Sequence, residues 1–200
     1  MMAPRPDVSD QRKQQILDAA MRVFARKGFH NARMDDIAQE ADLSKGTLYW
    51  YFRSKDAIIE ALVDKMFQWE LHTLGQLAAD ASRSVPERLR QLAHNIVQSL
   101  EFWGQTMPLL YEFYALATRP GPVRDVLQRY YDRYHATLTQ MIAEGVRRGE
   151  LQPLDADLIA VTMIAQFEGL MLLWVIAPAT FDFHTHWLPM ADRLVQSLEA

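Results

Sequence analysis

The chain has 200 residues, half of them hydrophobic, which is enough to bury a sizeable core in one domain or in a small and a large domain. It contains no cysteine, which excludes a disulfide framework and thiolate chemistry. The formal net charge of −4 argues against a general polyanion binder.

Charge is unevenly distributed along the chain. Residues 1–60 hold ten Lys and Arg against nine Asp and Glu, which leaves eleven basic and sixteen acidic residues for the remainder. The N-terminal part therefore carries +1 and the rest −5, a modest asymmetry that favours nucleic acid at the N-terminal end. Residues 1–8 are polar, rich in proline and without the apolar segment of a signal peptide, so we expect a mobile arm on a cytoplasmic protein.

Residues 9–53 predict three helices. A stripe of apolar side chains runs from Ser9 to about Lys27, and Gly28 follows at a position where helices commonly end, with Phe29 able to pack back on the helix. A short second helix with two aspartates in its first turn and a tight turn come next. Two short helices joined in this way form a helix-turn-helix.

The start of the third helix carries an unusual set of residues. Ser44 suits the N-cap, because a serine hydroxyl accepts a hydrogen bond from a first-turn N–H. Lys45, Gly46 and Thr47 follow, where a helix built for stability would carry an acid to complement its dipole. A lysine opposes that dipole and a glycine costs about 1 kcal/mol relative to alanine, so this end is suited to meet an anion. The serine–lysine pair at 54–55 repeats the pattern.

Four aromatic residues in a row occupy positions 49–52. They cannot all face a core on a 3.6-residue period, so at least one of Tyr49, Trp50 and Tyr51 must point outward, where a phenol can reach a phosphate oxygen. The alternative interpretation, an ordinary solvated helix face, leaves the combination of serine caps, lysines and aromatics unexplained.

These residues carry a family resemblance over about residues 10–60. The segment resembles the recognition-helix signature of the TetR/AcrR family of bacterial transcriptional regulators through Lys45-Gly46-Thr47-Leu48-Tyr49-Trp50-Tyr51-Phe52, Ser54-Lys55, Gly28-Phe29 and Ile37-Ala38. One position departs from the pattern: Met34 stands where members often carry a threonine that caps the second helix and binds phosphate. Arg33 beside it can supply a charged contact instead.

The resemblance implies an all-α fold of about nine helices, with a mobile arm (1–8), a helix-turn-helix DNA-binding domain (9–53) and a ligand-binding and dimerisation domain (54–200). It also implies a homodimer, most often a repressor, which binds a palindromic double-stranded DNA operator and is released by a small, largely hydrophobic effector. Lys45, Gly46 and Thr47 would then read bases. Phosphates would be held by Ser44, Arg33, Tyr49, Trp50, Tyr51 and Lys55.

Six further helices are predicted beyond residue 53. Apolar positions at helical spacing indicate helices over 54–81, 86–103, 107–118, 123–148, 155–177 and 187–198. The fifth of these, opening at Asp155 or Asp157, is apolar on nearly every face, but Thr162, Gln166 and Glu168 interrupt it and no basic flank follows. We therefore expect no membrane association. Instead, the last two helices of each subunit would form a four-helix dimer interface.

The C-terminal domain is rich in bulky, adaptable side chains. Each can be ordinary core, or together they can line a small-molecule pocket in which polar groups orient the ligand. The candidate ligand-binding residues are Trp69, Phe102, Trp103, Met107, Tyr111, Tyr114, Tyr134, Gln166, Phe167, Met171 and Trp174.

No arrangement of residues points to catalysis. His184 and His186, near Asp182, supply too few fixed ligands for a metal site and indicate a surface loop. No acid or histidine has a nucleophile at a useful spacing, and no Gly-rich phosphate loop is present, so we expect neither an enzyme nor a cofactor. The alternative function is an architectural or adaptor DNA-binding protein whose C-terminal domain makes only protein contacts.

Overall fold

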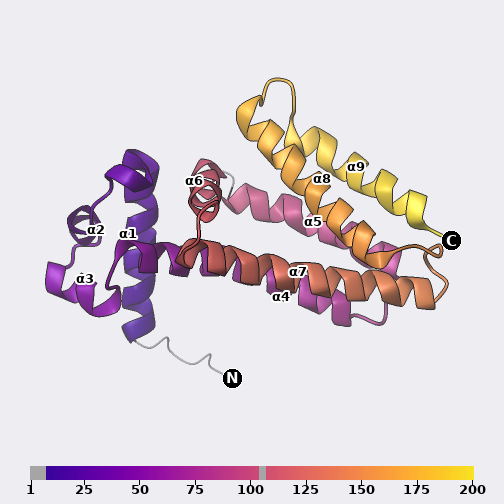
Figure 1. Cartoon of the computed structure of the whole chain (residues 1–200), viewed down its shortest axis with the longest axis horizontal. Helices are drawn as coiled ribbons and strands as arrows, with labels where there is room; N and C mark the ends of the chain where they lie inside the picture. The colour runs from indigo at the N-terminus through magenta and orange to yellow at the C-terminus, as the bar shows by residue number, and fades with distance from the viewer. Residues whose placement is uncertain (1–7, 104–106) are drawn as a thin grey trace. The chain divides into compact units, whose positions relative to one another are not determined.

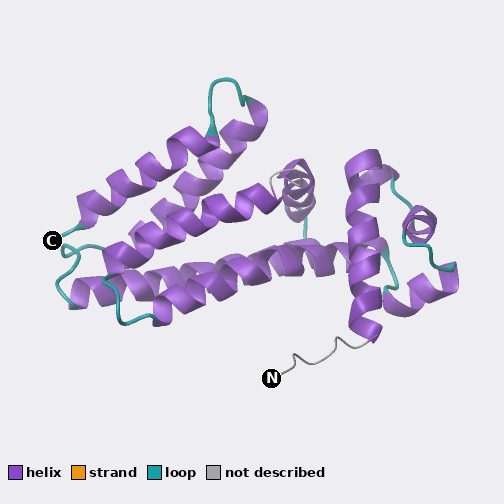
Figure 2. Cartoon of the chain, turned by 180° about the vertical axis from the view of Figure 1, so that it is seen from behind, coloured by secondary structure: helices purple, strands orange, loops and turns teal. Residues whose placement is uncertain are grey.

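The computed structural model describes residues 8–103 and 107–200, and in these ranges short loops join helices, with one isolated β-bridge between Leu151 and Glu199 (Figures 1 and 2). The described helices are α1 (Val8–Asn31), α2 (Met34–Glu40), α3 (Lys45–Tyr51), α4 (Lys55–Ala79), α5 (Val85–Trp103), α6 (Met107–Ala117), α7 (Pro122–Arg147), α8 (Ala156–Ile176) and α9 (Phe183–Leu198). The all-α expectation is confirmed.

Two helix boundaries differ from the expected ones by more than two residues. α1 resumes for three residues after a kink at Gly28, whose φ of 70° is left-handed and favours glycine. α9 begins at Phe183 rather than residue 187, because the Asp182 carboxylate accepts a hydrogen bond of 2.9 Å from the Thr185 N–H and caps the helix. The surface loop expected around His184 is therefore wrong, since those residues form the first turn of α9.

The chain divides into two compact units, and the first contains the helix-turn-helix. It comprises the chain up to Met66 together with residues 108–127, so α6 shares a unit with α1–α3. Its core includes Leu48 on α3 and Ile37 on α2, which are both fully buried. The rings of Phe24 and Phe29 meet edge to face at 5.7 Å, which confirms that the residue after the Gly28 kink packs back on α1.

The second unit comprises residues 67–107 and 128–200 and has its own apolar core. Buried side chains from the end of α4 and from α5, α7, α8 and α9 form one cluster that includes Leu74, Leu89, Leu138 and Val195. The indole N–H of Trp187 donates 2.9 Å to the Ala93 carbonyl and so ties α9 to α5.

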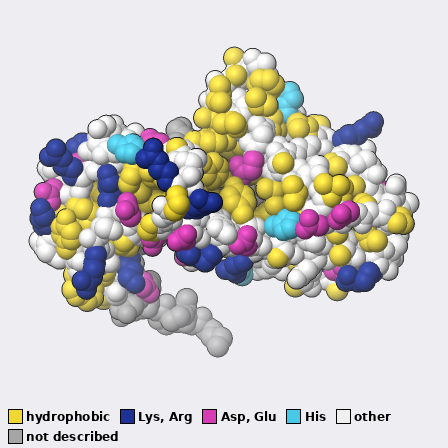
Figure 3. All heavy atoms as spheres, viewed as in Figure 1, with side chains coloured by type: hydrophobic (Ala, Val, Ile, Leu, Met, Phe, Trp, Pro, Cys, Tyr) yellow, Lys and Arg dark blue, Asp and Glu magenta, His cyan; other side chains and the backbone are white. Residues whose placement is uncertain are grey.

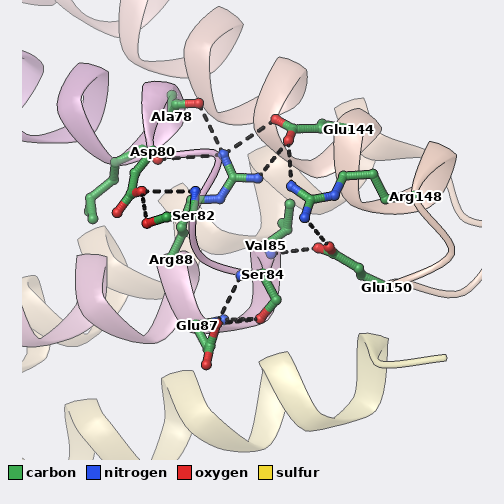
Figure 4. A network of polar contacts seen from close by, with 11 residues as sticks. Ala78, Asp80, Ser82, Ser84, Val85, Glu87, Arg88, Glu144, Arg148 and Glu150 are labelled. Atoms are coloured by element: carbon green, nitrogen blue, oxygen red, sulfur yellow. Dashed lines mark hydrogen bonds and ion pairs between the residues drawn. The ribbon is translucent and has the colours of Figure 1, made fainter.

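A buried arginine organises the turn between α4 and α5 in the second unit (Figure 4). Arg88 is fully buried and forms an ion pair with Glu144 on α7 at 2.8 Å, and it donates 3.0 Å to the Ala78 carbonyl at the end of α4. Arg148 binds the same carboxylate oxygen of Glu144, Oε1, and also pairs with Glu150, which accepts a hydrogen bond from the Val85 N–H at the start of α5. The network fixes the α4–α5 turn against α7.

An apolar stripe runs along the solvent side of α8. Leu158, Val161, Leu172, Leu173 and Ile176 are between 41% and 71% exposed and recur at helical spacing. The small residues at 165 and 169 lie in the same stripe and are also exposed. By length and composition α8 is the one described helix that could cross a membrane, and Figure 3 shows hydrophobic side chains gathered over its end. A stripe of this kind is typical of a protein–protein contact.

Candidate DNA-binding and ligand-binding sites

The third helix presents its first turn to solvent. The Ser44 hydroxyl accepts a hydrogen bond of 3.1 Å from the Thr47 N–H, which confirms the predicted N-cap. Lys45 and Gly46 are exposed, whereas Leu48 is fully buried and anchors the helix. An added Cβ at Gly46 would meet only the Ser44 hydroxyl, at 3.8 Å, so the surface around this backbone is open.

The four aromatic residues at positions 49–52 lie partly in solvent and partly in the core, as the 3.6-residue period of a helix requires. Trp50 is 73% exposed and Tyr49 41% exposed, while Phe52 is buried. Tyr51 is half-buried and packs edge-on against Trp50, with ring centroids 4.5 Å apart. The outward-pointing aromatics that the sequence required are therefore present.

Several cations of the helix-turn-helix are already paired with acids. Lys45 lies 2.8 Å from Asp35 on α2, and this contact raises the pKa of the lysine. Arg26 and Arg22 both bind Glu40, and these two bonds lower the pKa of Glu40 to about 2. A contact of Lys45 with a base or a phosphate would therefore share its ammonium with Asp35 or replace that carboxylate.

Lys55 makes contacts with the end of α1 that the sequence did not predict. Its ammonium donates to the carbonyls of Phe29 and Ala32, at 2.5 and 2.9 Å, and lies 4.1 Å from the centre of the Phe29 ring. Burial lowers the pKa of Lys55. These contacts close the end of α1, so the structure favours a structural role over the expected phosphate contact. Ser54 caps the start of α4, as the serine–lysine pair at 54–55 predicted, since its hydroxyl accepts a hydrogen bond of 3.1 Å from the Ala57 N–H.

Arg33 occupies the N-cap position of α2. Its backbone N–H donates 3.0 Å to Asp36, and its side chain is exposed. Met34 is the first residue of the helix. The charged contact expected of the residue beside the missing threonine stays a prediction, which the exposure of this guanidinium leaves open.

The second unit encloses a cavity of about 40 Å³ between five helices. α4 contributes Trp69, Glu70 and Thr73; α5 contributes Leu89, Leu92, Ala93, Asn95 and Ile96; α7 contributes Tyr130, Tyr131, Tyr134 and Leu138; α8 contributes Met163, Ile164, Gln166, Phe167 and Glu168; and α9 contributes Trp187, Ala191, Leu194 and Val195. Most of these side chains are apolar or aromatic, which is the composition of a small-molecule site.

Two carboxylates stand in this apolar wall, each bound by a tyrosine. The Tyr130 hydroxyl donates 2.7 Å to Glu70, and the Tyr131 hydroxyl donates 2.5 Å to Glu168. Burial, and secondarily the charge of Glu168, raises the pKa of Glu70 to about 7. Burial also raises the pKa of Tyr134, so its phenol is neutral.

The cavity contains part of the residue set expected from the sequence. Trp69, Tyr134, Gln166 and Phe167 line it. Tyr111 and Tyr114 belong to the first unit, where their rings meet at 5.5 Å. Met107 and Met171 are buried outside the cavity lining, and Trp174 packs against Phe183. The side chains of Phe102 and Trp103 lie outside the described residues.

Sequence reasoning missed Glu70, Tyr130, Tyr131 and Trp187 as cavity residues and noted Glu168 only as a polar interruption of an apolar helix. The usable signal was a lone carboxylate inside an apolar helical stretch, which occurs at both glutamates. A buried carboxylate needs a partner, so each of them indicates a polar site within a core.

Two family models match the chain. Residues 16–62 match the bacterial regulatory proteins of the tetR family, and residues 85–198 match the C-terminal part of BetI-type transcriptional repressors. Among curated proteins, the HTH-type transcriptional regulator TtgR of Pseudomonas putida is 28% identical over 191 residues, which cover 91% of this chain and 89% of TtgR.

Solved structures share the fold. A transcriptional regulator from Saccharomonospora viridis in complex with choline superposes with a TM-score of 0.75 at 22% identity, over 94% of this chain and 95% of the other. The SmeT–triclosan complex superposes with a TM-score of 0.78 at 18% identity, over 94% and 90%. Since the second family model alone spans more than half of the sequence, the chain belongs to the TetR family of bacterial transcriptional regulators.

Proposed function

We propose that this regulator binds a palindromic DNA operator as a homodimer and represses transcription in the cytoplasm until a small, largely hydrophobic effector releases it. One observation carries the proposal. The capped first turn of α3 is exposed and has no acid, while the second unit encloses an aromatic cavity away from that helix in the sequence. A site for DNA and a site for a small molecule thus occur in one chain.

On DNA, the N-terminal end of α3 would enter the major groove. Lys45, Gly46 and Thr47 would lie at base edges, with the lysine directed at guanine acceptors. Phosphates would be held by the groups around them: the cap-forming Ser44, the exposed Arg33, Tyr49 and Trp50, and the half-buried Tyr51.

Dimerisation would use the apolar stripe of α8 together with α9. The small residues in the middle of the stripe allow two helices to approach closely, and Gly169 has open space where a Cβ would stand. A two-fold contact of this kind repeats the helix-turn-helix symmetrically, which is why a palindromic operator is expected.

Effector binding would occur in the cavity of the second unit. The likeness to regulators crystallised with choline and with triclosan supports a small-molecule site in this chain. The effector can shift the protein away from DNA only by binding one conformation more tightly than the other.

A Lys45→Ala variant tests the reading of bases. Operator sites selected from a random duplex pool should form two symmetric half-sites, and the variant should lose preference at one defined position in each. Equal loss of affinity on all sequences would show that Lys45 reads no base.

A Leu172→Arg variant tests the dimer. Sedimentation should show a dimer for the unmodified protein and a monomer for the variant, because a charge on the stripe cannot be buried in an apolar interface. The matched control is Ala136→Arg on the exposed face of α7, which should stay dimeric. A dimer in both variants would contradict the α8 interface.

Release by an effector separates this proposal from an architectural adaptor. Thermal shifts over a panel of hydrophobic and cationic compounds should identify ligands that stabilise the protein in proportion to occupancy. The same compounds should lower operator affinity. A protein that binds DNA but responds to no compound would be an adaptor.

A further inference from the structure

Two side chains of the second unit separate the cavity from an outer hollow. Gln166 on α8 and Leu194 on α9 line the cavity, and both also line an open hollow of about 510 Å³ on α9 and the adjoining side of α8. They are the only described residues that line both spaces, and each is half-buried. Gln166 and Leu194 therefore form a shared wall, with the cavity on one side and the hollow on the other.

The hollow lies beside the apolar stripe of α8. Thr162 stands four positions before Gln166 and Gly169 three positions after it, so these three residues share one side of the helix. Thr162 and Gly169 are exposed, and Gly169 has open space where a Cβ would stand. A Gln166 side chain that turned outward would thus stand next to the stripe, at the point where α8 has the least bulk. The rest of the hollow is lined from α9 by Pro189, Met190, Arg193 and Ser197.

The size of the cavity means that an occupant must move part of its lining. Its volume of about 40 Å³ is well below the roughly 300 Å³ of a typical drug-sized site. Lining residues such as Leu89 and Leu138 belong to the buried cluster, and close-packed side chains have little room to move. The shared wall has the hollow behind it and so has room to yield. Trp69, which is 44% exposed, is the alternative place.

We propose that an occupant of the cavity displaces the shared wall into the hollow and thereby weakens the contact between the α8 helices of two copies of this chain. This linkage rests on the proposed function in one respect, namely that the stripe of α8 forms the dimer contact. It adds a regulation of that contact, because filling the cavity and pairing of the subunits oppose each other. Coupling between two sites is reciprocal, so dimerisation weakens binding of the occupant by the same factor.

A substitution that fills the cavity can stand for an occupant. Ala93 on α5 is buried and lines the cavity, so Ala93→Leu adds an isopropyl group to that space. Subunit exchange then reports the strength of the dimer contact. The chain has no cysteine, so Ala136→Cys on the exposed face of α7 gives one labelling site per subunit. Donor-labelled and acceptor-labelled dimers are mixed, and the growth of energy transfer gives the exchange rate.

We expect Ala93→Leu to accelerate exchange by about fivefold or more, the usual size of a coupling between sites. Ala93→Val adds less bulk and should accelerate exchange by less, which keeps the test open if the larger side chain prevents folding. The matched control is Ala20→Leu, which overpacks a fully buried position of α1 in the first unit and should leave the exchange rate unchanged. An unchanged rate in both Ala93 variants would overturn the proposal and place the yielding part elsewhere, as at Trp69.

Removal of a wall side chain tests the route. In a Gln166→Ala background, the acceleration by Ala93→Leu should fall by at least about half, because one of the two side chains to be displaced is gone. The control background is Thr162→Ala, which removes an exposed side chain from the same side of α8 outside the cavity lining. There the acceleration should stay complete. Equal acceleration in both backgrounds would overturn the role of the shared wall.

Sedimentation of Leu172→Arg separates this linkage from the proposed function. If that variant is monomeric and Ala93→Leu leaves the exchange of the unmodified interface unchanged, the α8 dimer stands and the linkage falls. If Leu172→Arg remains dimeric, the α8 contact is overturned and the linkage falls with it, whatever the exchange rates. A monomeric Leu172→Arg together with faster exchange in Ala93→Leu supports both.

Discussion

The backbone N–H of Phe29 donates a hydrogen bond of 2.8 Å to the Glu112 carboxylate, which joins the end of α1 to α6 across 83 residues of sequence. Gly28, just before it, has φ 70° and ψ 159°, a non-helical conformation open essentially to glycine alone, which brings this N–H out of the helical ladder. The carboxylate therefore supplies the acceptor that the kink removes. Through this bond and the carbonyl contacts of Lys55, the C-terminal end of α1 is held from both sides.

Removing that acceptor should loosen the end of α1. We expect Glu112→Ala to lower the free energy of unfolding by about 1–2 kcal/mol, since a half-buried N–H loses its partner. Hydrogen exchange at residues 28–32 should accelerate. Glu112→Gln keeps an acceptor oxygen and should cost less. Identical losses in both variants would show that the carboxyl acts through its charge alone.

Substitution of Lys55 distinguishes the two roles considered for it. We expect Lys55→Met to destabilise the protein by about 1–3 kcal/mol in urea unfolding, because it removes a charged donor from two carbonyls. The slope of log affinity against log salt for operator DNA should stay nearly unchanged. A slope shallower by about one unit, with normal stability, would restore the phosphate contact.

Release of Lys45 from its acid should strengthen DNA binding. Asp35→Asn removes the carboxylate that holds the lysine and also one negative charge beside the proposed groove contact. We expect operator affinity to rise severalfold at low salt, measured by fluorescence anisotropy of labelled duplex. Asp18→Asn removes the same charge on α1 and serves as the control. An equal gain in the control would attribute the effect to net charge.

The Arg88–Glu144 pair should respond unequally to loss of its two members. Arg88 is fully buried and Glu144 has 27% of its side chain exposed. Glu144→Leu leaves a buried guanidinium without its acid and should cost about 3–5 kcal/mol of unfolding free energy. Arg88→Met leaves a carboxylate that water can reach and should cost less. Arg148→Ala, on the exposed side of the network, should cost under about 1 kcal/mol.

Glu70 gives the stability a distinct pH dependence. Its folded-state pKa is raised from 4.5 to about 7, so between these values the native protein keeps a proton that the unfolded chain has lost. This group therefore lowers stability as pH rises through that window. We expect Glu70→Gln to gain stability relative to the unmodified protein between pH 4.5 and 7, measured by urea unfolding. A stability difference between the two proteins that stays constant from pH 4.5 to 7 would show that the pKa of Glu70 is not raised.

The helix-turn-helix was predictable because its signals are local. Serine caps at 44 and 54 and the glycine at 28 fix helix ends through neighbours only a few residues away. The cavity was less predictable, because its lining depends on which face each of five helices directs toward the others, and the sequence does not give that orientation. A tryptophan such as Trp187 looks like any core residue until α9 is placed against α5. The carbonyl contacts of Lys55 were not predictable for the same reason, since its partners lie more than 20 residues away in the sequence.

The exposure of Trp50 has a practical consequence. Of the five tryptophans in the chain, only this one lies in the helix-turn-helix, and its indole is largely in water. Its emission is thus a built-in optical reporter for that region, spectrally separable once the other four indoles are replaced by phenylalanine. Docking on duplex could then be followed in real time without attaching any dye to either molecule.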